Sequence, residues 1–137
     1  MNLQPLDALQ WVRTRPQQFF PLGKPEPIYL LAYLMADVLE LGRGSCTIRQ
    51  RDGWWIIGSE IDWLHDARHS ETELFERVVA APQHGEHSMR GEVLLSAFAR
   101  SVWIALDGRR VCIQGEEPPP GAWDQAVDLH RAIVFAM

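Results

Sequence analysis

The sequence predicts an α+β domain, a two-layer sandwich with helices on one face of a mainly antiparallel sheet. Two observations support this fold class. Short apolar segments flank both Asp52-Gly53 and Asp107-Gly108, and Asp-Gly in that setting is a strong signal for a tight β-hairpin. The segments before and between the hairpins have apolar residues at helical spacing. No linker or repeat divides the chain, so residues 1–137 are expected to form one domain.

The first half of the chain is expected to contain two helices and one hairpin. Pro5 and the following LDALQWV predict a short helix, because proline is tolerated in an opening turn. The longest helix is predicted over Pro27–Leu41 and ends at Gly42. Its apolar residues lie on nearly all sides, which indicates burial. The alternation in 46–51 predicts a half-buried strand, and 54–57 predicts the strand that returns beside it.

The second half is expected to contain two more helices, a second hairpin and an ambiguous tail. Ser70 and Glu73 form the capping-box pattern S-x-x-E, which predicts a helix at that point, and Ser88 can cap another. The segments SVWIAL and RRVCIQ are the predicted strands of the second hairpin. In the tail, 124–130 has a helical pattern, and 132–135 is expected to form a strand at the edge of the sheet.

Composition and charge narrow the classes of function. The net charge of -5 does not suit a domain that binds DNA or RNA, so nucleic acid is not an expected partner. No apolar run approaches the ~18 residues of a membrane span, and the N-terminus lacks the pattern of a signal peptide. Cys46 and Cys112 are expected to be free thiols in a reducing compartment. A cytoplasmic protein without membrane contact is therefore predicted.

Four segments, in the same order along the chain, resemble one known family. They are LQWVRTRPQQFF (9–20), LLAYLMADVLELGRGSC (30–46), ELFERVVAAPQHGEHSMRGEVLLSAFA (73–99) and VWIALDGRRVCIQGEEP (102–118). The family is the N-terminal ATPase domain of the B subunits of DNA gyrase and topoisomerase IV. The four segments are similar, in order, to its opening segment, its long helix, its ATP lid with the following helix, and a hairpin. This family belongs to the GHKL superfamily. The resemblance implies the histidine-kinase-like ATPase fold.

The resemblance also shows which chemistry the sequence lacks. Family members carry a glutamate that acts as general base and, four residues later, an asparagine that binds magnesium. The resemblance places these positions at Ala32 and Ala36. The sole asparagine of the chain is Asn2, and the family's D-x-G-x-G turn occurs nowhere, so no alignment restores the motifs. ATP hydrolysis and a bound cofactor are therefore not expected. Asp37 and Glu40 are expected at the solvent edge of the long helix or in a polar contact near its end.

The resemblance further marks a vestigial nucleotide site. The stretch 58–62 would replace the D-x-G-x-G turn, and Gly91 would remain from the end of the lid. The vestigial positions are Ala32, Ala36, Gly58, Glu60, Asp62, Arg90 and Gly91. Ala32 and Ala36 are expected to point at the sheet or at a cavity beside it.

Three hypotheses of function follow. The leading one is a catalytically inactive gyrase-B-like domain that acts as a protein-binding or regulatory module, with a protein partner or as a homodimer. The first alternative is a non-hydrolysing binder of a nucleotide or small ligand that reuses the ATP cavity. The second alternative is a small metal-binding enzyme. Its ligands would be four histidines, two of them at helical i, i+4 spacing. They are His65, His69, His84 and His87.

Overall fold

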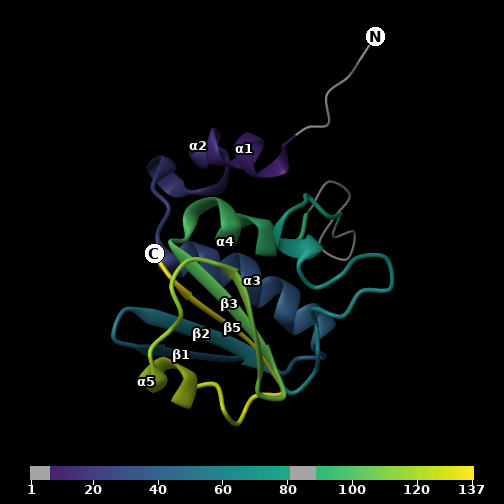
Figure 1. Ribbon diagram of the computed structural model, residues 1–137. Helices are drawn as coiled ribbons and strands as arrows, with labels where there is room; N and C mark the ends of the chain where they lie inside the picture. The colour runs from purple at the N-terminus through teal and green to yellow at the C-terminus, as the bar shows by residue number, and fades with distance from the viewer. Residues whose placement is uncertain (1–6, 81–88) are drawn as a thin grey trace.

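The computed structural model describes residues 7–80 and 89–137 and has an α+β fold, as predicted. Its centre is a five-stranded antiparallel sheet with the strand order β1-β2-β5-β3-β4 (Figure 1). The strands are β1 (Thr47–Arg51), β2 (Trp54–Ser59), β3 (Ser101–Leu106), β4 (Arg109–Gln114) and β5 (Arg131–Ala136). β1 and β4 form the two edges of this sheet.

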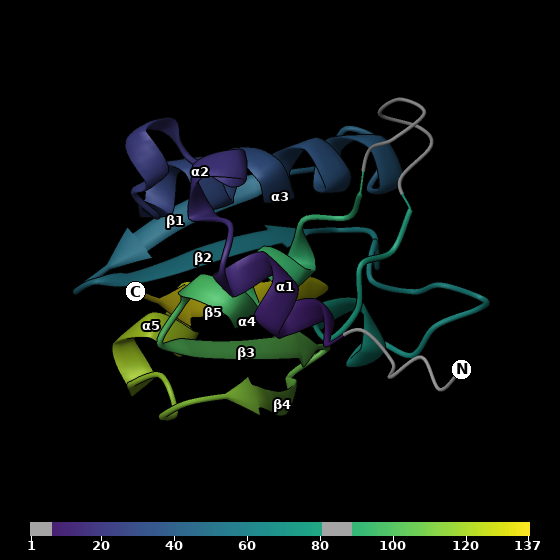
Figure 2. The ribbon, with the colours of Figure 1, turned by 90° about the horizontal axis from the view of Figure 1, so that it is seen from above.

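The helices lie on both faces of the sheet. They are α1 (Ala8–Arg13), α2 (Pro16–Phe19), α3 (Pro27–Leu41), α4 (Glu92–Phe98) and α5 (Pro120–Asp124), with 3-10 turns η1 (Pro21–Gly23) and η2 (Glu73–Phe75). α3 packs on β2, and α4 packs on β3 beside it, while α1 covers α4 as an outer layer (Figure 2). α5 packs against β1 and β2 from the opposite face (Figure 1). The expectation that all helices share one face is therefore wrong for α5.

Each face of the sheet has its own apolar core. Successive residues of a strand point to opposite faces, and β2 shows the division clearly. Ile57 belongs to the larger core under α3 and α4, whereas Ile56 belongs to the smaller core under α5. Trp123 of α5 fills the centre of that smaller core, where it packs edge-on against Trp103 with ring centroids 6.2 Å apart.

The two hairpins form where they were predicted. Asp52 and Gly53 have φ values of 51° and 83°, and Asp107 and Gly108 have φ values of 48° and 82°. Two successive residues with positive φ are the geometry of the tight hairpin turn that Asp-Gly favours. The helix α3 also has the predicted bounds, Pro27–Leu41.

The tail differs from its prediction in two ways. β5 is the central strand, hydrogen-bonded to β2 on one side and β3 on the other, and all six of its residues are buried. A strand covered on both faces appears in sequence as a continuous apolar run, which AIVFA is. The expected edge strand is therefore wrong. The helical pattern at 124–130 is also misplaced, because α5 spans Pro120–Asp124 and ends there.

The predicted helix after Ser70 is a single 3-10 turn, η2. The hydroxyl of Ser70 does accept a hydrogen bond from the backbone N–H of Glu73, at 3.2 Å. The helix ends after this turn, where the backbone N–H groups of Glu76 and Arg77 both donate to the carbonyl of Glu73. The expected cap Ser88 lies outside the described residues, and α4 follows Gly91 without a side-chain cap.

Candidate functional site

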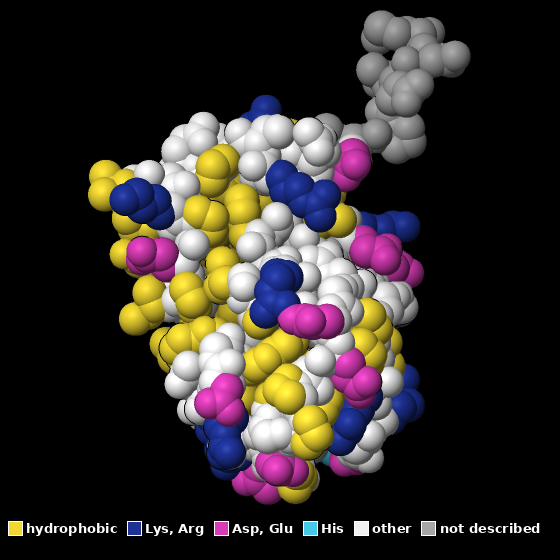
Figure 3. Space-filling view, turned by 60° about the vertical axis from the view of Figure 1, so that its left-hand side comes forward, with side chains coloured by type: hydrophobic (Ala, Val, Ile, Leu, Met, Phe, Trp, Pro, Cys, Tyr) yellow, Lys and Arg dark blue, Asp and Glu magenta, His cyan; other side chains and the backbone are white. Residues whose placement is uncertain are grey.

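The outward side of α3 is apolar although it faces solvent. Leu30, Leu34 and Val38 point into the core and are 1% exposed or less. Ile28 and Leu39 lie on the other side of the same helix and are 67% and 43% exposed. Figure 3 shows hydrophobic side chains gathered on the side of the molecule where α3 lies. We call this surface the α3 face. It consists of Ile28, Ala32, Tyr33, Met35, Ala36 and Leu39.

Ala32 and Ala36 point away from the sheet. Both are exposed, whereas their neighbours Leu31 and Asp37 are buried. The expectation that they face the sheet or a cavity beside it is therefore wrong. The reason is geometric, because a helix of 3.6 residues per turn that buries Leu34 must turn these alanines outward.

A groove runs along the α3 face at the two alanines. It has a volume of about 380 Å³. Its lining residues are Phe19, Pro21, Tyr29, Ala32, Tyr33 and Ala36. The hydroxyl of Tyr33 donates a hydrogen bond of 2.9 Å to the carbonyl of Phe19, which fixes one wall of the groove to α2. Leu22, in the turn next to Pro21, is 92% exposed and extends the apolar surface. The groove can therefore accept apolar side chains, and the hydrogen bond of Tyr33 holds one of its walls in place.

Arg90, Asp37 and Glu92 form a sealed cluster between α3 and the start of α4. All three side chains are 4% exposed or less. Arg90 donates to both carboxylate oxygens of Glu92, at 2.5 and 3.2 Å, and to the carbonyl of Trp63 at 3.3 Å. Its Nε lies 3.7 Å from Oδ2 of Asp37. That same oxygen accepts a 2.7 Å hydrogen bond from the backbone N–H of Gly91.

Burial governs the titration of the two carboxyl groups in this cluster. Burial and the nearby charge of Asp37 raise the pKa of Glu92 to about 7, although Arg90 opposes the rise. Burial also raises the pKa of Asp37. The backbone N–H of Gly91, the charge of Arg90 and an interaction with Glu92 oppose that rise in the pKa of Asp37.

The predicted site residues Arg90 and Gly91 belong to this sealed cluster. The side chain of Arg90 is 4% exposed, and its guanidinium contacts Glu92 and the carbonyl of Trp63. Asp37, which was expected at the solvent edge or in a polar contact near the helix end, is 1% exposed and holds the start of α4. The solvent-edge alternative is therefore wrong for Asp37, whereas Glu40 is exposed.

Asp62 lies in a separate polar cleft of about 310 Å³ at one end of the sheet. Arg131 of β5 is 2% exposed there and contacts Asp62 at 2.7 Å and Glu71 at 2.7 Å. Arg109 contacts the other oxygen of Glu71 at 3.1 Å. Two carboxylates thus face two guanidinium groups. These ion pairs tie Asp62 and Glu71 to the sheet, and Asp66 adds a third carboxylate to the lining of the cleft.

His65 and His69 both line this cleft. Nδ1 of His69 lies 3.4 Å from Oε2 of Glu73. Within residues 7–80 and 89–137, no group of three or more His, Cys, Asp or Glu side chains could hold a metal ion. His84 and His87 lie outside the described residues. The described part of the histidine cluster is therefore insufficient for a metal site.

The remaining predicted residues have structural contacts. A Cβ at Gly58 would lie 2.7 Å from the carbonyl oxygen of Arg131 and also collide with Leu129, so this glycine permits β2 and the chain before β5 to approach closely. Glu60 is exposed, and its backbone N–H donates to the hydroxyl of Ser45 at 3.0 Å. The seven vestigial positions are therefore spread over the α3 face, the sealed cluster, the polar cleft, β2 and the residue that follows β2.

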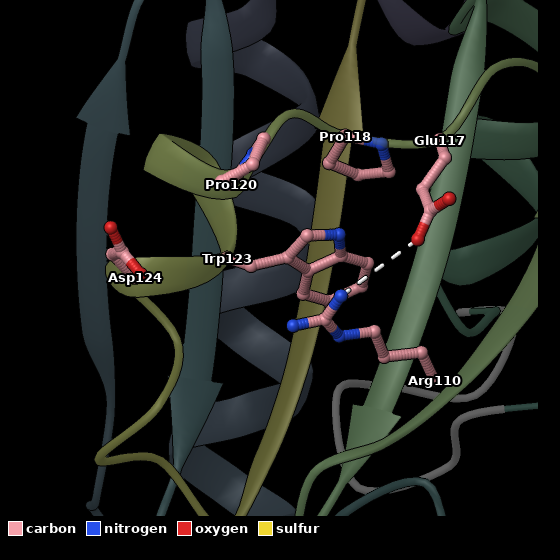
Figure 4. A pocket seen from close by; sticks show the side chains of 6 residues that line it. All are labelled: Arg110, Glu117, Pro118, Pro120, Trp123 and Asp124. Carbon is pink, nitrogen blue, oxygen red and sulfur yellow. Dashed lines mark ion pairs between the residues drawn. The ribbon is translucent and has the colours of Figure 1, made fainter.

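A smaller pocket of about 230 Å³ lies on the opposite face of the sheet, beside Trp123 (Figure 4). The guanidinium of Arg110 covers the indole of Trp123 at 4.3 Å from the ring centroid, and it lies 3.8 Å from Glu117. Trp103 packs against the same indole. The chain's own side chains therefore occupy the ring surface that a ligand would need.

Comparison with known protein families, curated proteins and solved structures gives no match for this chain. No helix in the described part of the chain is long and apolar enough to cross a membrane. The α3 face and its surroundings are therefore the features that bear on the function of this protein.

Proposed function

We propose that this protein is a non-catalytic protein-binding module and that the α3 face is its contact surface. One observation carries the proposal, which is the exposure of large apolar side chains along one side of a buried helix. Single exposed apolar residues are ordinary, but a contiguous apolar surface marks an interaction site. Ile28, Met35 and Leu39 recur at i, i+7 and i+11 and form one continuous stripe.

The scaffold under this surface is proposed to be a degenerate gyrase-B-like domain of the GHKL type. The order of a long helix, a hairpin, a short helix and a second hairpin supports the proposal. Alanine at positions 32 and 36 removes both the base and the magnesium ligand that the family uses. We infer that these positions now contribute to a binding surface in place of an ATPase site. A cytoplasmic location remains part of the proposal, on the strength of the sequence.

The occupant that best fits the α3 face is a second copy of this chain. A two-fold axis forms contacts in which residue i meets j and j meets i. An axis through the middle of α3, between Tyr33 and Leu34, places Ile28 opposite Leu39 of the other copy. The same axis places Ala32 opposite Met35. Small side chains then lie against large ones, which allows two antiparallel helices to pack closely.

A nucleotide fits this surface less well. The groove at Ala32 and Ala36 has no charged side chain in its lining, and phosphate groups require basic side chains or oriented N–H groups. In the polar cleft, Arg109 and Arg131 are already paired with carboxylates. The alternative of a nucleotide binder therefore has weaker support than a protein contact.

The test is the molar mass in solution, measured by light scattering at several concentrations. The protein is expected to form a dimer, and Ala32→Arg is expected to yield a folded monomer with the circular dichroism spectrum of the wild type and a melting temperature that no longer depends on protein concentration. Position 32 is exposed and arginine is a good helix former, so the fold tolerates the change. The matched control is Val127→Arg, at a 74% exposed apolar residue outside the α3 face, which should remain dimeric. A monomeric wild type, or a dimer that survives Ala32→Arg, would contradict the proposal.

A further inference from the structure

We propose that the pocket beside Trp123 binds an extended segment of a partner protein, one that carries a basic side chain and, two residues away, a small aliphatic side chain. The pocket lies on the face of the sheet that α5 covers, opposite α3 (Figure 1). The inference therefore goes beyond the proposed function and concerns a second surface. It is carried by polar groups that line the pocket and have no hydrogen-bond partner in the described part of the chain.

The first of these groups is the indole N–H of Trp123. The side chain is 4% exposed, and its Nε1 has no hydrogen-bond partner among the described residues. A buried donor without an acceptor is unfavourable, so an acceptor that reaches it is bound favourably. Arg110 covers a face of the indole, but Figure 4 shows the nitrogen on the ring edge toward Pro118 and Glu117. Recognition at this pocket therefore uses the edge of the ring, and a peptide carbonyl is a suitable acceptor.

The charged side chains at the pocket leave room for such a carbonyl. Arg110 and Glu117 are 47% and 58% exposed, and their charged atoms lie 3.8 Å apart, beyond hydrogen-bond distance. Arg110 makes no hydrogen bond within the part of the chain that the structure describes. In the polar cleft, by contrast, Arg131 contacts two carboxylates at 2.7 Å each. The polar groups of the cleft are thus already paired, whereas those of the pocket can turn toward a ligand.

The charge of the pocket is complementary to a basic ligand. Its lining contains two carboxylates, Glu117 and Asp124, and one guanidinium, that of Arg110. Asp124 is exposed, and its carboxylate has no ion-pair partner in the described residues. Figure 4 shows it on α5, on the other side of Trp123 from Glu117. A lysine or arginine of the partner can therefore pair with Asp124 without displacing an existing ion pair.

A second cavity gives the site a place for an aliphatic side chain. Its volume is about 120 Å³, and it adjoins the pocket because Arg110 and Trp123 line both. The rest of its lining is apolar and consists of Ala105, Gly108, Ala126, Val127 and Leu129. In an extended peptide, side chains two residues apart lie on one side and about 7 Å from each other. Such a pair can enter the two adjoining cavities while a carbonyl between them meets the indole N–H.

The experiment follows the indole N–H signal of Trp123 in nitrogen-15 spectra, assigned with Trp123→Phe. The probe is the peptide acetyl-Lys-Gly-Val-amide, and acetyl-Glu-Gly-Val-amide is the control of equal length and opposite charge. The lysine peptide is expected to shift the indole proton downfield in a saturable manner, because the N–H gains an acceptor. The glutamate peptide is expected to leave the signal in place. No saturable shift with the lysine peptide, or the same shift with both peptides, would overturn the inference.

A pair of aspartate variants tests which carboxylate binds the lysine. Asp124→Asn retains the shape of an exposed side chain and removes its charge, so the dissociation constant of the lysine peptide should rise about threefold, as for one exposed ion pair. Asp128→Asn is the matched control, because Asp128 pairs with Arg49 and does not line the pocket. It should bind as the wild type does. Equal constants in the wild type and Asp124→Asn would contradict the assignment. The indole signal reports the pocket in monomer and dimer alike, so this result is independent of the test of the α3 face.

Discussion

The two sides of α3 have similar side chains and opposite surroundings. Leu30, Leu34 and Val38 are enclosed by the sheet and α4, while Ile28 and Leu39 are exposed to solvent. Hydrophobic burial accounts for the apolar residues on the enclosed side, since each enclosed side chain contributes about 1.5–3 kcal/mol to folding. The second side contributes little to the folded monomer. This difference supports the proposal that the outward side serves a contact outside the monomer.

The largest effect is expected from the enclosed side. Leu34→Ala removes a fully buried side chain, and the remaining cavity adds to the lost transfer energy. The free energy of unfolding should fall by about 3 kcal/mol, within the 2–5 kcal/mol range of such changes. Chemical denaturation checks this value. A loss below about 1 kcal/mol, the cost of an ordinary surface change, would mean that α3 does not pack on the sheet as described.

The stability of the protein is expected to depend on pH through Glu92, in the buried cluster between α3 and α4. Since the pKa of Glu92 is raised to about 7 in the folded protein, the free energy of unfolding should decrease as pH rises from about 4.5 to about 7. The decrease should be on the order of 3 kcal/mol at most, because one pKa unit corresponds to 1.36 kcal/mol. Denaturation curves at pH 5 and pH 8 measure it. Glu92→Gln should remove most of the slope, and an unchanged slope would place the titrating group elsewhere.

A smaller effect is expected at the groove wall. Tyr33→Phe removes the hydrogen bond from the tyrosine hydroxyl to the carbonyl of Phe19 and leaves the ring in place. The cost to stability should be about 1 kcal/mol or less, because this bond is partly exposed. The dimer should weaken more than the monomer loses stability. Sedimentation and thermal denaturation of the same variant separate the two effects, and an unaltered dimer would exclude this wall from the contact.

The sequence predicted those features of the fold that depend on residues close together in the chain. Asp52-Gly53 and Asp107-Gly108 specify hairpin turns by themselves, and the bounds of α3 follow from Pro27 and Gly42. The place of β5 between β2 and β3 could not be read in this way. It depends on pairing with a strand more than 70 residues earlier, such as that between Ile57 and Ile133.

The candidate site was less predictable than the fold. An apolar helix does not reveal which side meets the sheet, so Ala32 and Ala36 were expected to face inward. The burial of Asp37 depends on Gly91, 54 residues later in the chain. The sequence contained one usable signal for the candidate site. The long helix has apolar residues on nearly all sides, which is more than contact with a single core requires. The resemblance to gyrase B placed Ala32 and Ala36 on α3 correctly as helix residues but predicted the wrong side of the helix for them.

The most direct measurement is the distance between side chains of two copies. In a mixture of isotopically labelled and unlabelled protein at pH 6, intermolecular nuclear Overhauser effects report contacts between copies alone. We predict effects from the methyl group of Met35 in one copy to Ala32 in the other, and from Ile28 to Leu39. The absence of intermolecular effects, or effects confined to residues outside α3 such as Val127, would contradict the account.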